Sequence, residues 1–171
     1  MPPASMELNL PDSGATESLG RALALALPDT ATAGAVVYLQ GDLGTGKTTT
    51  ARSMLHSLGV VGKVRSPTYT LIDTYLLPRV ACVHIDLYRV QSLNEVEELG
   101  IRDLSGPGSL RLIEWPEKGA GVIPLADLIL ALDYAGEARR VVVTPGSSFG
   151  ENWVAKLLQD NSLRPYVSNL T

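Results

Sequence analysis

The sequence has little of several features that would place it in a particular class of protein. Cysteine occurs once, at position 82, so the chain cannot close an internal disulfide and a reducing compartment is expected. No apolar stretch approaches the roughly 20 residues that a membrane span needs. The first ten residues, "MPPASMELNL", lack the basic start and the apolar run of a signal peptide. We therefore expect a cytoplasmic protein with no membrane association.

Basic residues are also scarce. The chain has 14 Lys and Arg against 18 Asp and Glu, which gives a net charge of −4. This balance argues against a broad nucleic-acid-binding face, but it leaves room for a small basic patch. Hydrophobic residues make up 45% of the 171 residues, which is typical of one globular domain. We expect that domain to span residues 1–160, with a loose C-terminal tail over 161–171.

Apolar patterning predicts an α/β fold. Leucine at every fourth position predicts a helix over 16–27, capped at its start by Asp12, Ser13 or Thr16. Short apolar runs predict strands at 35–40, 80–86 and 110–115 and a hairpin of 127–134 and 139–145. Further helices are expected at 47–58, closed by Gly59, at 92–100, capped by serine, and at 150–159. This order favours a single-domain, mostly parallel sheet flanked by helices, with a C-terminal antiparallel hairpin.

The stretch "GDLGTGKTTT", residues 41–50, has the P-loop spacing GxxxxGK[ST] between a predicted strand and a predicted helix. Its glycines let the backbone turn its N–H groups inward around an anion, and the helix adds the positive end of its dipole. In such a loop the lysine reaches the β- and γ-phosphates and the Thr hydroxyl is offered to Mg²⁺. We therefore predict a P-loop NTPase. The expected nucleotide contacts of the loop are Gly44, Thr45, Gly46, Lys47, Thr48 and Thr49.

Two acidic residues stand at the ends of apolar strands. Asp86 ends "VACVHID" and Glu114 ends "LRLIE", and the carboxyl ends of strands form the edge of an open α/β sheet where ligands bind. One carboxylate can hold the metal shell while the other orients a water. The residues alone leave open which acid does which, and whether one of them is only a strand-end cap.

Five segments occur in one order: "GDLGTGKTT", "SPTYTLIDTY", "HIDLYR", "ELGIRD" and "IEWPEKG". Together they closely resemble the bacterial TsaE family, formerly called YjeE, from about residue 10 to about residue 155. The resemblance implies a P-loop α/β fold that binds ATP with Mg²⁺ and hydrolyses it slowly alone. It also implies two partners, TsaD and TsaB, which install threonylcarbamoyl on adenosine 37 of tRNAs reading ANN codons. Hydrolysis then supports turnover of the complex, and tRNA is met indirectly, through that complex.

The resemblance also assigns residues. Lys47 and Thr48 become the phosphate and metal groups of the P-loop. Glu114 of "IEWPE" matches the metal-linked acid of the family, and Asp86 of "HIDLYR" matches its Walker-B-like acid, so these two acids and Lys47 are the expected catalytic residues. Two further matches are Trp115, an aromatic residue beside the site, and Asp12, in a region near the adenine.

Other residues admit two interpretations each. "SPTYTL", residues 66–71, follows the P-loop helix as a switch segment does, with Thr68 and Thr70 as sensors of Mg²⁺ or the γ-phosphate; it also fits an ordinary Ser-Pro turn. His84 shares the strand side of Asp86, and we expect a packed or hydrogen-bonded histidine rather than a catalytic one. Either a basic patch near the nucleotide or ordinary surface charge would explain Arg65, Arg89 and Arg102.

Three classes of function remain open on these residues. The first is the ATPase of a protein complex, and the alternative enzyme is a small-molecule or nucleoside kinase. Kinases on this scaffold usually carry an arginine-rich lid, and the sequence has no such segment. A GTP switch or a pure interaction module is the third class. The guanine-reading [NT]KxD stretch is absent, and an interaction module would not need two acids at its site.

Overall fold

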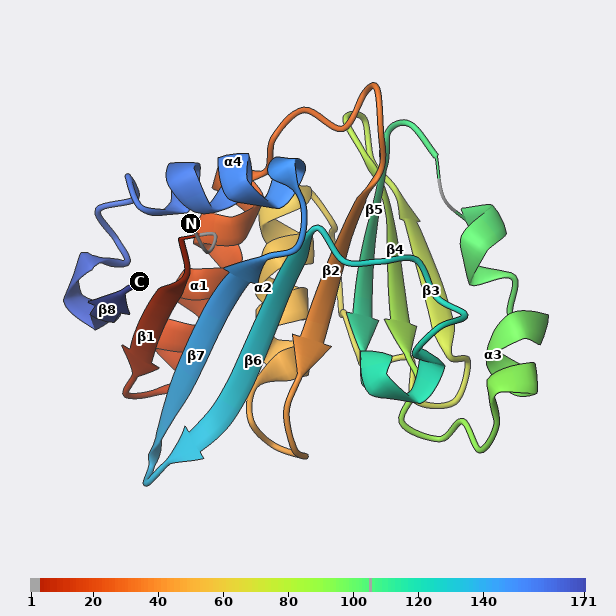
Figure 1. The fold of residues 1–171 in the computed structure, drawn as a ribbon, viewed down its shortest axis with the longest axis horizontal. Helices are drawn as coiled ribbons and strands as arrows, with labels where there is room; N and C mark the ends of the chain where they lie inside the picture. The colour runs from red at the N-terminus through yellow and green to blue at the C-terminus, as the bar shows by residue number, and fades with distance from the viewer. Residues whose placement is uncertain (1–3, 105) are drawn as a thin grey trace.

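A computed structural model describes residues 4–104 and 106–171, which form one eight-stranded sheet with helices on both faces (Figure 1). The strands stand in the order β3-β4-β5-β2-β6-β7-β1-β8. Their bounds are β1 Met6–Leu10, β2 Ala35–Gln40, β3 Ile72–Leu76, β4 Ala81–Asp86, β5 Ser109–Glu114, β6 Leu128–Ala135, β7 Ala138–Pro145 and β8 Val167–Leu170. The α-helices are α1 Ser13–Ala26, α2 Lys47–Leu58, α3 Leu93–Glu98 and α4 Ser148–Leu157. Three short 3-10 helices are η1 Ile101–Leu104, η2 Pro116–Gly119 and η3 Arg164–Tyr166.

The sheet is mixed. β2 pairs in parallel with β5 and with β6, and β4 pairs in parallel with β5. Antiparallel pairs are more numerous: β3 with β4, β6 with β7, and β1 with both β7 and β8. The α/β class and the β6–β7 hairpin are confirmed, but the expectation of a mostly parallel sheet is wrong. Residues 77–80 are too short for the crossover that a parallel β3–β4 pair would need, and strands from both chain ends extend the hairpin.

β1 and β8 have no counterpart in the sequence prediction. β1 buries Met6, Leu8 and Leu10 in strict alternation. β8 lies against β1, and the N–H of Thr171 donates to the carbonyl of Ser5 at 3.1 Å. Leu163, just before η3, is fully buried. The prediction of a loose tail over 161–171 is therefore wrong, because strand pairing and one buried leucine hold this segment.

Each face of the sheet has its own apolar core. One core lies under α1, α2 and α4, and the other lies under α3, η1 and the segment around Ile123. α1 and α2 approach each other closely at Gly20, where a Cβ would lie 2.6 Å from the Cβ of Ser53. Within the described residues, no helix is both long and apolar enough to cross a membrane.

Three predicted helix caps are confirmed, although α1 begins three residues earlier than predicted. Of the three candidate caps of α1, Asp12 is the one used, and its Oδ1 accepts from the N–H of Ala15 at 2.8 Å. Gly59 ends α2 with φ 118°. Ser92 caps α3 through the N–H of Glu95. Asp12 therefore fixes where α1 begins, Gly59 where α2 ends and Ser92 where α3 begins.

Candidate functional site

A pocket of about 320 Å³ lies at the carboxyl ends of the three central strands β2, β4 and β5. Six of its twelve lining residues belong to the segment from Gly41 to Thr49, called here the glycine loop; they are Leu43, Gly44, Gly46, Lys47, Thr48 and Thr49. The other six come from the strand ends and the switch-like segment 66–71, and they are Ser66, Thr68, Asp86, Tyr88, Glu114 and Trp115. The structure thus brings both predicted acids and most of the predicted loop residues to one place.

The glycine loop needs glycine at positions 41 and 46. Gly41 has φ 142°, and a Cβ there would lie 2.2 Å from the carbonyl oxygen of Leu132. Gly46 has φ 104° and is the N-cap residue of α2. Thr45 is fully buried, with its hydroxyl donating to the carbonyl of Asp42 at 2.9 Å. The loop therefore closes tightly, and the N-terminus of α2 meets the pocket.

Lys47 is folded back onto the loop. Its Nζ donates to the carbonyls of Gly41 at 2.6 Å and Asp42 at 2.7 Å, and it lies 4.4 Å from the centre of the Trp115 ring. Burial lowers the pKa of Lys47, and the carboxylate of Glu114 is the largest of several acids that oppose this shift. An anion in the pocket would favour the protonated lysine and give its ammonium a charged partner.

Glu114 is a buried acid with two partners. The hydroxyl of Thr48 lies 3.0 Å from Oε1 and 3.1 Å from Oε2. Nε2 of His84 lies 2.8 Å from Oε1. His84 is therefore a hydrogen-bonded histidine, as expected from its strand position. Glu114, on the strand beside β2, is the acid that contacts the Thr of the glycine loop.

Asp86 contacts the switch-like segment instead. It lies directly opposite Glu114 in the β4–β5 pair. Its Oδ2 accepts from the hydroxyl of Ser66, its Oδ1 accepts from the N–H of Tyr88 at 2.9 Å, and its own N–H donates to the carbonyl of Leu71. Segment 66–71 is thus attached to Asp86 near both ends. Thr68 lines the pocket, whereas Thr70 bonds to Asp73, away from it.

Two non-glycine residues have positive φ in the described part of the chain, and both flank the pocket. They are Leu71, with φ 66°, and Trp115, with φ 57°. Such backbone conformations cost free energy and cluster at functional sites. The Trp115 ring packs against Tyr88, with ring centres 5.0 Å apart. The unusual backbone at Trp115 turns an aromatic ring over Lys47 directly after Glu114.

Asp12 lies on the other side of the glycine loop. A second pocket, of about 220 Å³, is lined there by Asp12, Thr16, Thr45, Thr49 and Arg139 among others. Gly44, Gly46 and Thr49 line both pockets, so the two spaces adjoin at the loop. The predicted site residues therefore fall in two adjoining spaces, with the acids in one and Asp12 in the other.

Two residues of the β6–β7 hairpin that were not predicted from the sequence also contact the glycine loop. The hydroxyl of Tyr134 donates to the carbonyl of Leu43, and Nη2 of Arg139 donates to the carbonyl of Gly44 at 3.2 Å. Arg139 also stacks on the Tyr134 ring, 4.5 Å from its centre. The parallel pairing of β6 with β2 brings the hairpin tip to the loop. Only knowledge of that strand order would have pointed to these residues.

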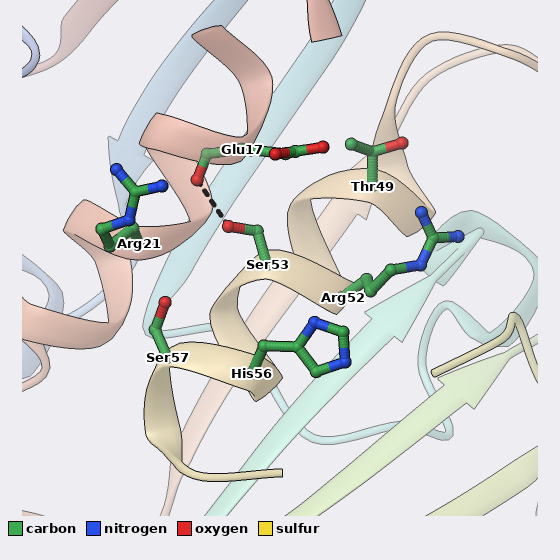
Figure 2. Close-up of a pocket in the computed structure, with 7 residues that line it drawn as sticks. All are labelled: Glu17, Arg21, Thr49, Arg52, Ser53, His56 and Ser57. Carbon is green, nitrogen blue, oxygen red and sulfur yellow. Dashed lines mark hydrogen bonds between the residues drawn. The ribbon is translucent and has the colours of Figure 1, made fainter. Parts of the chain in front are cut away.

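A third, larger pocket of about 480 Å³ lies between α1 and α2 (Figure 2). It is lined by Glu17, Arg21, Thr49, Arg52, Ser53, His56 and Ser57. Of the predicted site residues only Thr49 belongs to it. Nε of Arg52 donates to the carbonyl of Val64, and Nε2 of His56 forms a hydrogen bond with the carbonyl of Gly62. Size alone therefore does not locate the predicted chemistry, which lies in the smaller pockets.

The three arginines considered as a basic patch do not gather at the site. Arg89 stacks on Tyr69, 4.3 Å from its ring centre. Arg102 donates to the carbonyls of Val122 and Gly121 at 3.0 and 3.1 Å. Neither of these, nor Arg65, lines either pocket at the glycine loop. The pocket beside Glu114 therefore has one cationic side chain among its lining residues, Lys47.

Fold and site together define an α/β protein with a polar pocket at the ends of parallel strands, built on a glycine loop, a buried lysine and two acids. A family model described as "Threonylcarbamoyl adenosine biosynthesis protein TsaE" matches residues 10–142. The chain belongs to the TsaE family.

Relatives named "tRNA threonylcarbamoyladenosine biosynthesis protein TsaE" come from distant bacteria. The protein of Haemophilus influenzae is 44% identical over 120 residues, which cover 70% of this chain and 76% of the relative. That of Streptomyces coelicolor is 38% identical over 143 residues, 79% of this chain and 91% of the relative. The crystal structure of Bacillus subtilis YdiB matches with a TM-score of 0.71 and 25% identity, over 91% of this chain and 95% of that one.

Proposed function

We propose that this protein is a cytoplasmic, Mg²⁺-dependent ATPase that acts with TsaD and TsaB in forming threonylcarbamoyladenosine in tRNA. Its relatives carry the name of that biosynthesis. The observation that supports an ATPase best is the convergence of Lys47, Thr48 and Glu114 in one pocket on a glycine loop. We propose that ATP hydrolysis drives turnover of the complex and that tRNA is met through TsaD and TsaB.

ATP would lie along the glycine loop. Gly44, Gly46 and the first N–H groups of α2 face the phosphates, and Lys47 exchanges its two carbonyl partners for phosphate oxygens. The adjoining pocket at Asp12 and Thr49 binds the nucleoside part of ATP. Trp115, which packs at a tilt against Tyr88, covers Lys47 and keeps water away from it.

The donor set fits Mg²⁺. Among the described residues no group of three or more His, Cys, Asp or Glu side chains could hold a metal by itself. Mg²⁺ in phosphate sites uses only one or two protein oxygens besides water and phosphate. The Thr48 hydroxyl donates its proton to Glu114 and so keeps its lone pairs for a cation. When bound, Mg²⁺ would neutralise charge on the β- and γ-phosphates.

We propose different roles for the two acids. Glu114 orients the Thr48 hydroxyl and supplies the carboxylate beside the metal ion. Asp86, which contacts segment 66–71 through Ser66 and Leu71, orients the attacking water and links that segment to the phosphate. Phosphoryl transfer also needs positive charge on the γ-phosphate beyond Lys47. No arginine lines the Glu114 pocket in the described part of the chain, so a partner supplies the missing group and the isolated chain is a weak enzyme.

A steady-state ATPase assay tests this proposal. The rate should rise well above that of the isolated chain when TsaD and TsaB are added together, and Lys47→Met should remove both rates. Depletion of the protein should lower threonylcarbamoyladenosine in bulk tRNA, measured by mass spectrometry. Equal rates with and without the partners would mean a self-sufficient site, and phosphate transfer to a small-molecule acceptor would then be the better explanation.

A further inference from the structure

Among the described residues the imidazole of His84 makes one hydrogen bond, and that bond is directed at the candidate site. The imidazole is fully buried on β4, with Nε2 2.8 Å from Oε1 of Glu114. A carboxylate oxygen accepts, so Nε2 carries the proton and donates. Nδ1 has no hydrogen-bond partner among the residues that the structure describes. Glu114 is therefore the one hydrogen-bond partner of the imidazole among the described residues.

His84 stands on β4 between Leu112 on β5 and Asp73 on β3, and Cys82 lies two residues earlier on the same side of β4. Cys82 and Leu112 are fully or almost fully buried, whereas Asp73 accepts from the hydroxyl of Thr70 and makes no hydrogen bond to the imidazole. An aliphatic residue would fill such a place without leaving a ring nitrogen unpaired, and a buried unpaired polar atom is costly. Packing alone does not account for histidine at this position, whereas a hydrogen bond to Glu114 does.

That hydrogen bond limits the rotation of the Glu114 carboxylate. The terminal torsion of glutamate is broad when nothing restrains it. Oε1 receives both the imidazole N–H of His84 and the Thr48 hydroxyl, while Oε2 receives the hydroxyl alone. Two donors from different directions fix the carboxylate plane, so both oxygens stay turned toward Thr48.

We propose that His84 is a positioning residue of the nucleotide site. It holds Glu114 so that the carboxylate accepts a hydrogen bond from the Thr48 hydroxyl. The lone pairs of the Thr48 oxygen are then left to face a divalent cation. This inference rests on the proposed Mg²⁺–ATP site. Groups that orient metal-linked residues from outside are commonly worth about 10–100-fold in metal affinity or activity.

Two substitutions separate the hydrogen bond from the bulk of the ring. His84→Gln can carry an amide N–H to about the position of Nε2, whereas the shorter amide of His84→Asn reaches only the position of Nδ1. Cys82→Ala is the matched control, because it removes volume from the same side of the same strand and Cys82 lines neither pocket at the glycine loop. Binding of a fluorescent ATP analogue is titrated with Mg²⁺ for each folded protein, and thermal unfolding is recorded in parallel.

His84→Asn should raise the Mg²⁺ concentration for half-maximal tightening of nucleotide binding by about tenfold or more, whereas His84→Gln should stay within about threefold of the wild type. Cys82→Ala should leave the Mg²⁺ dependence unchanged. Affinity for the nucleotide in EDTA should be similar in all four proteins. An unchanged Mg²⁺ dependence in folded His84→Asn, or an equal loss in folded His84→Gln, would overturn the inference.

A double-mutant cycle tests whether His84 acts through Glu114. In a Glu114→Ala background, His84→Asn should change Mg²⁺-dependent nucleotide affinity no further, and a full additional loss would contradict the inference. ATP binding of the wild type that ignores Mg²⁺ would overturn the proposed function and this inference together. A Mg²⁺-dependent wild type with an unaffected His84→Asn variant overturns the inference alone.

Discussion

The hydroxyl of Thr48 lies 3.0 and 3.1 Å from the two oxygens of Glu114, and this contact joins the first turn of α2 to the last residue of β5. Asp86 ends the neighbouring strand and lies opposite Glu114, yet it turns to Ser66 and to the N–H of Tyr88. The two acids therefore address different parts of the same pocket. One meets the glycine loop and the other meets segment 66–71.

This division predicts different losses for the two acids. In the presence of Mg²⁺, Glu114→Ala should weaken ATP binding by about tenfold or more and abolish most of the effect of Mg²⁺. Asp86→Ala should keep the affinity within about threefold and lower partner-stimulated hydrolysis by about 100-fold or more. Isothermal titration with and without Mg²⁺, together with the ATPase assay, measures both. If Asp86→Ala loses the Mg²⁺ dependence and Glu114→Ala keeps it, the roles are reversed.

The buried lysine predicts a pH dependence of stability. Burial lowers the pKa of Lys47 in the folded chain from the ordinary value of 10.5. At a pH between the lowered pKa and 10.5, Lys47 is more often protonated in the unfolded chain than in the folded chain. The contribution of Lys47 to the free energy of unfolding therefore becomes more favourable as pH rises through this range. Methionine does not titrate, so the Lys47→Met variant should be more stable than the wild type at pH 7 without nucleotide. The margin, which is the difference in the free energy of unfolding between the two proteins, should narrow as pH approaches the ordinary pKa of lysine.

Chemical denaturation of both proteins at several pH values measures that margin. Arg79→Met, on an exposed turn before β4, is a control for loss of a surface charge. Its stability relative to the wild type should not change in the same pH range, because arginine stays protonated there. A margin for Lys47→Met that grows with pH would contradict the assignment of Lys47 as a lysine disfavoured by burial.

Most of the site could be predicted from sequence because each of its parts carries a local signal. The glycine spacing predicted a loop and helix at Lys47, and apolar runs ending in acid predicted that Asp86 and Glu114 would meet at one sheet edge. Burial of Lys47 could not be predicted, because its cover, Trp115, comes from a distant segment. The same holds for Tyr134 and Arg139, which reach the loop only through the β2–β6 pairing.

The errors in the fold have a related cause. β1 has a visible alternation of buried residues, but it spans five residues only. β8 is mostly exposed, so strand pairing rather than an apolar pattern defines it. Pairing between the two ends of a chain is a property of the whole fold. Local patterns therefore predicted the central strands and missed the edge strands β1 and β8, whose pairs make antiparallel pairing the more frequent kind.

The C-terminal segment should contribute to stability. Leu163 is fully buried against the core under α1 and α4, whereas Leu170 on β8 is 57% exposed. Leu163→Ala should lower the free energy of unfolding by about 2–4 kcal/mol. Leu170→Ala, the matched control, should change it by less than about 1 kcal/mol. Urea denaturation measures both, and equal effects of the two substitutions would mean that the segment does not pack as part of the core.

The hairpin tip should stabilise the glycine loop for nucleotide binding. Tyr134→Phe removes the hydroxyl that bonds the carbonyl of Leu43, but it keeps the ring on which Arg139 stacks. One hydrogen bond is worth about 0.5–1.5 kcal/mol, so ATP affinity should fall by about three- to tenfold. Tyr75→Phe, on the far edge strand β3, should leave ATP affinity unchanged. Calorimetric titration with Mg²⁺–ATP compares the two variants at equal folded fraction. Unchanged affinity in Tyr134→Phe would show that the loop reaches its binding conformation without the hairpin, and Arg139 would then be the remaining contact to test.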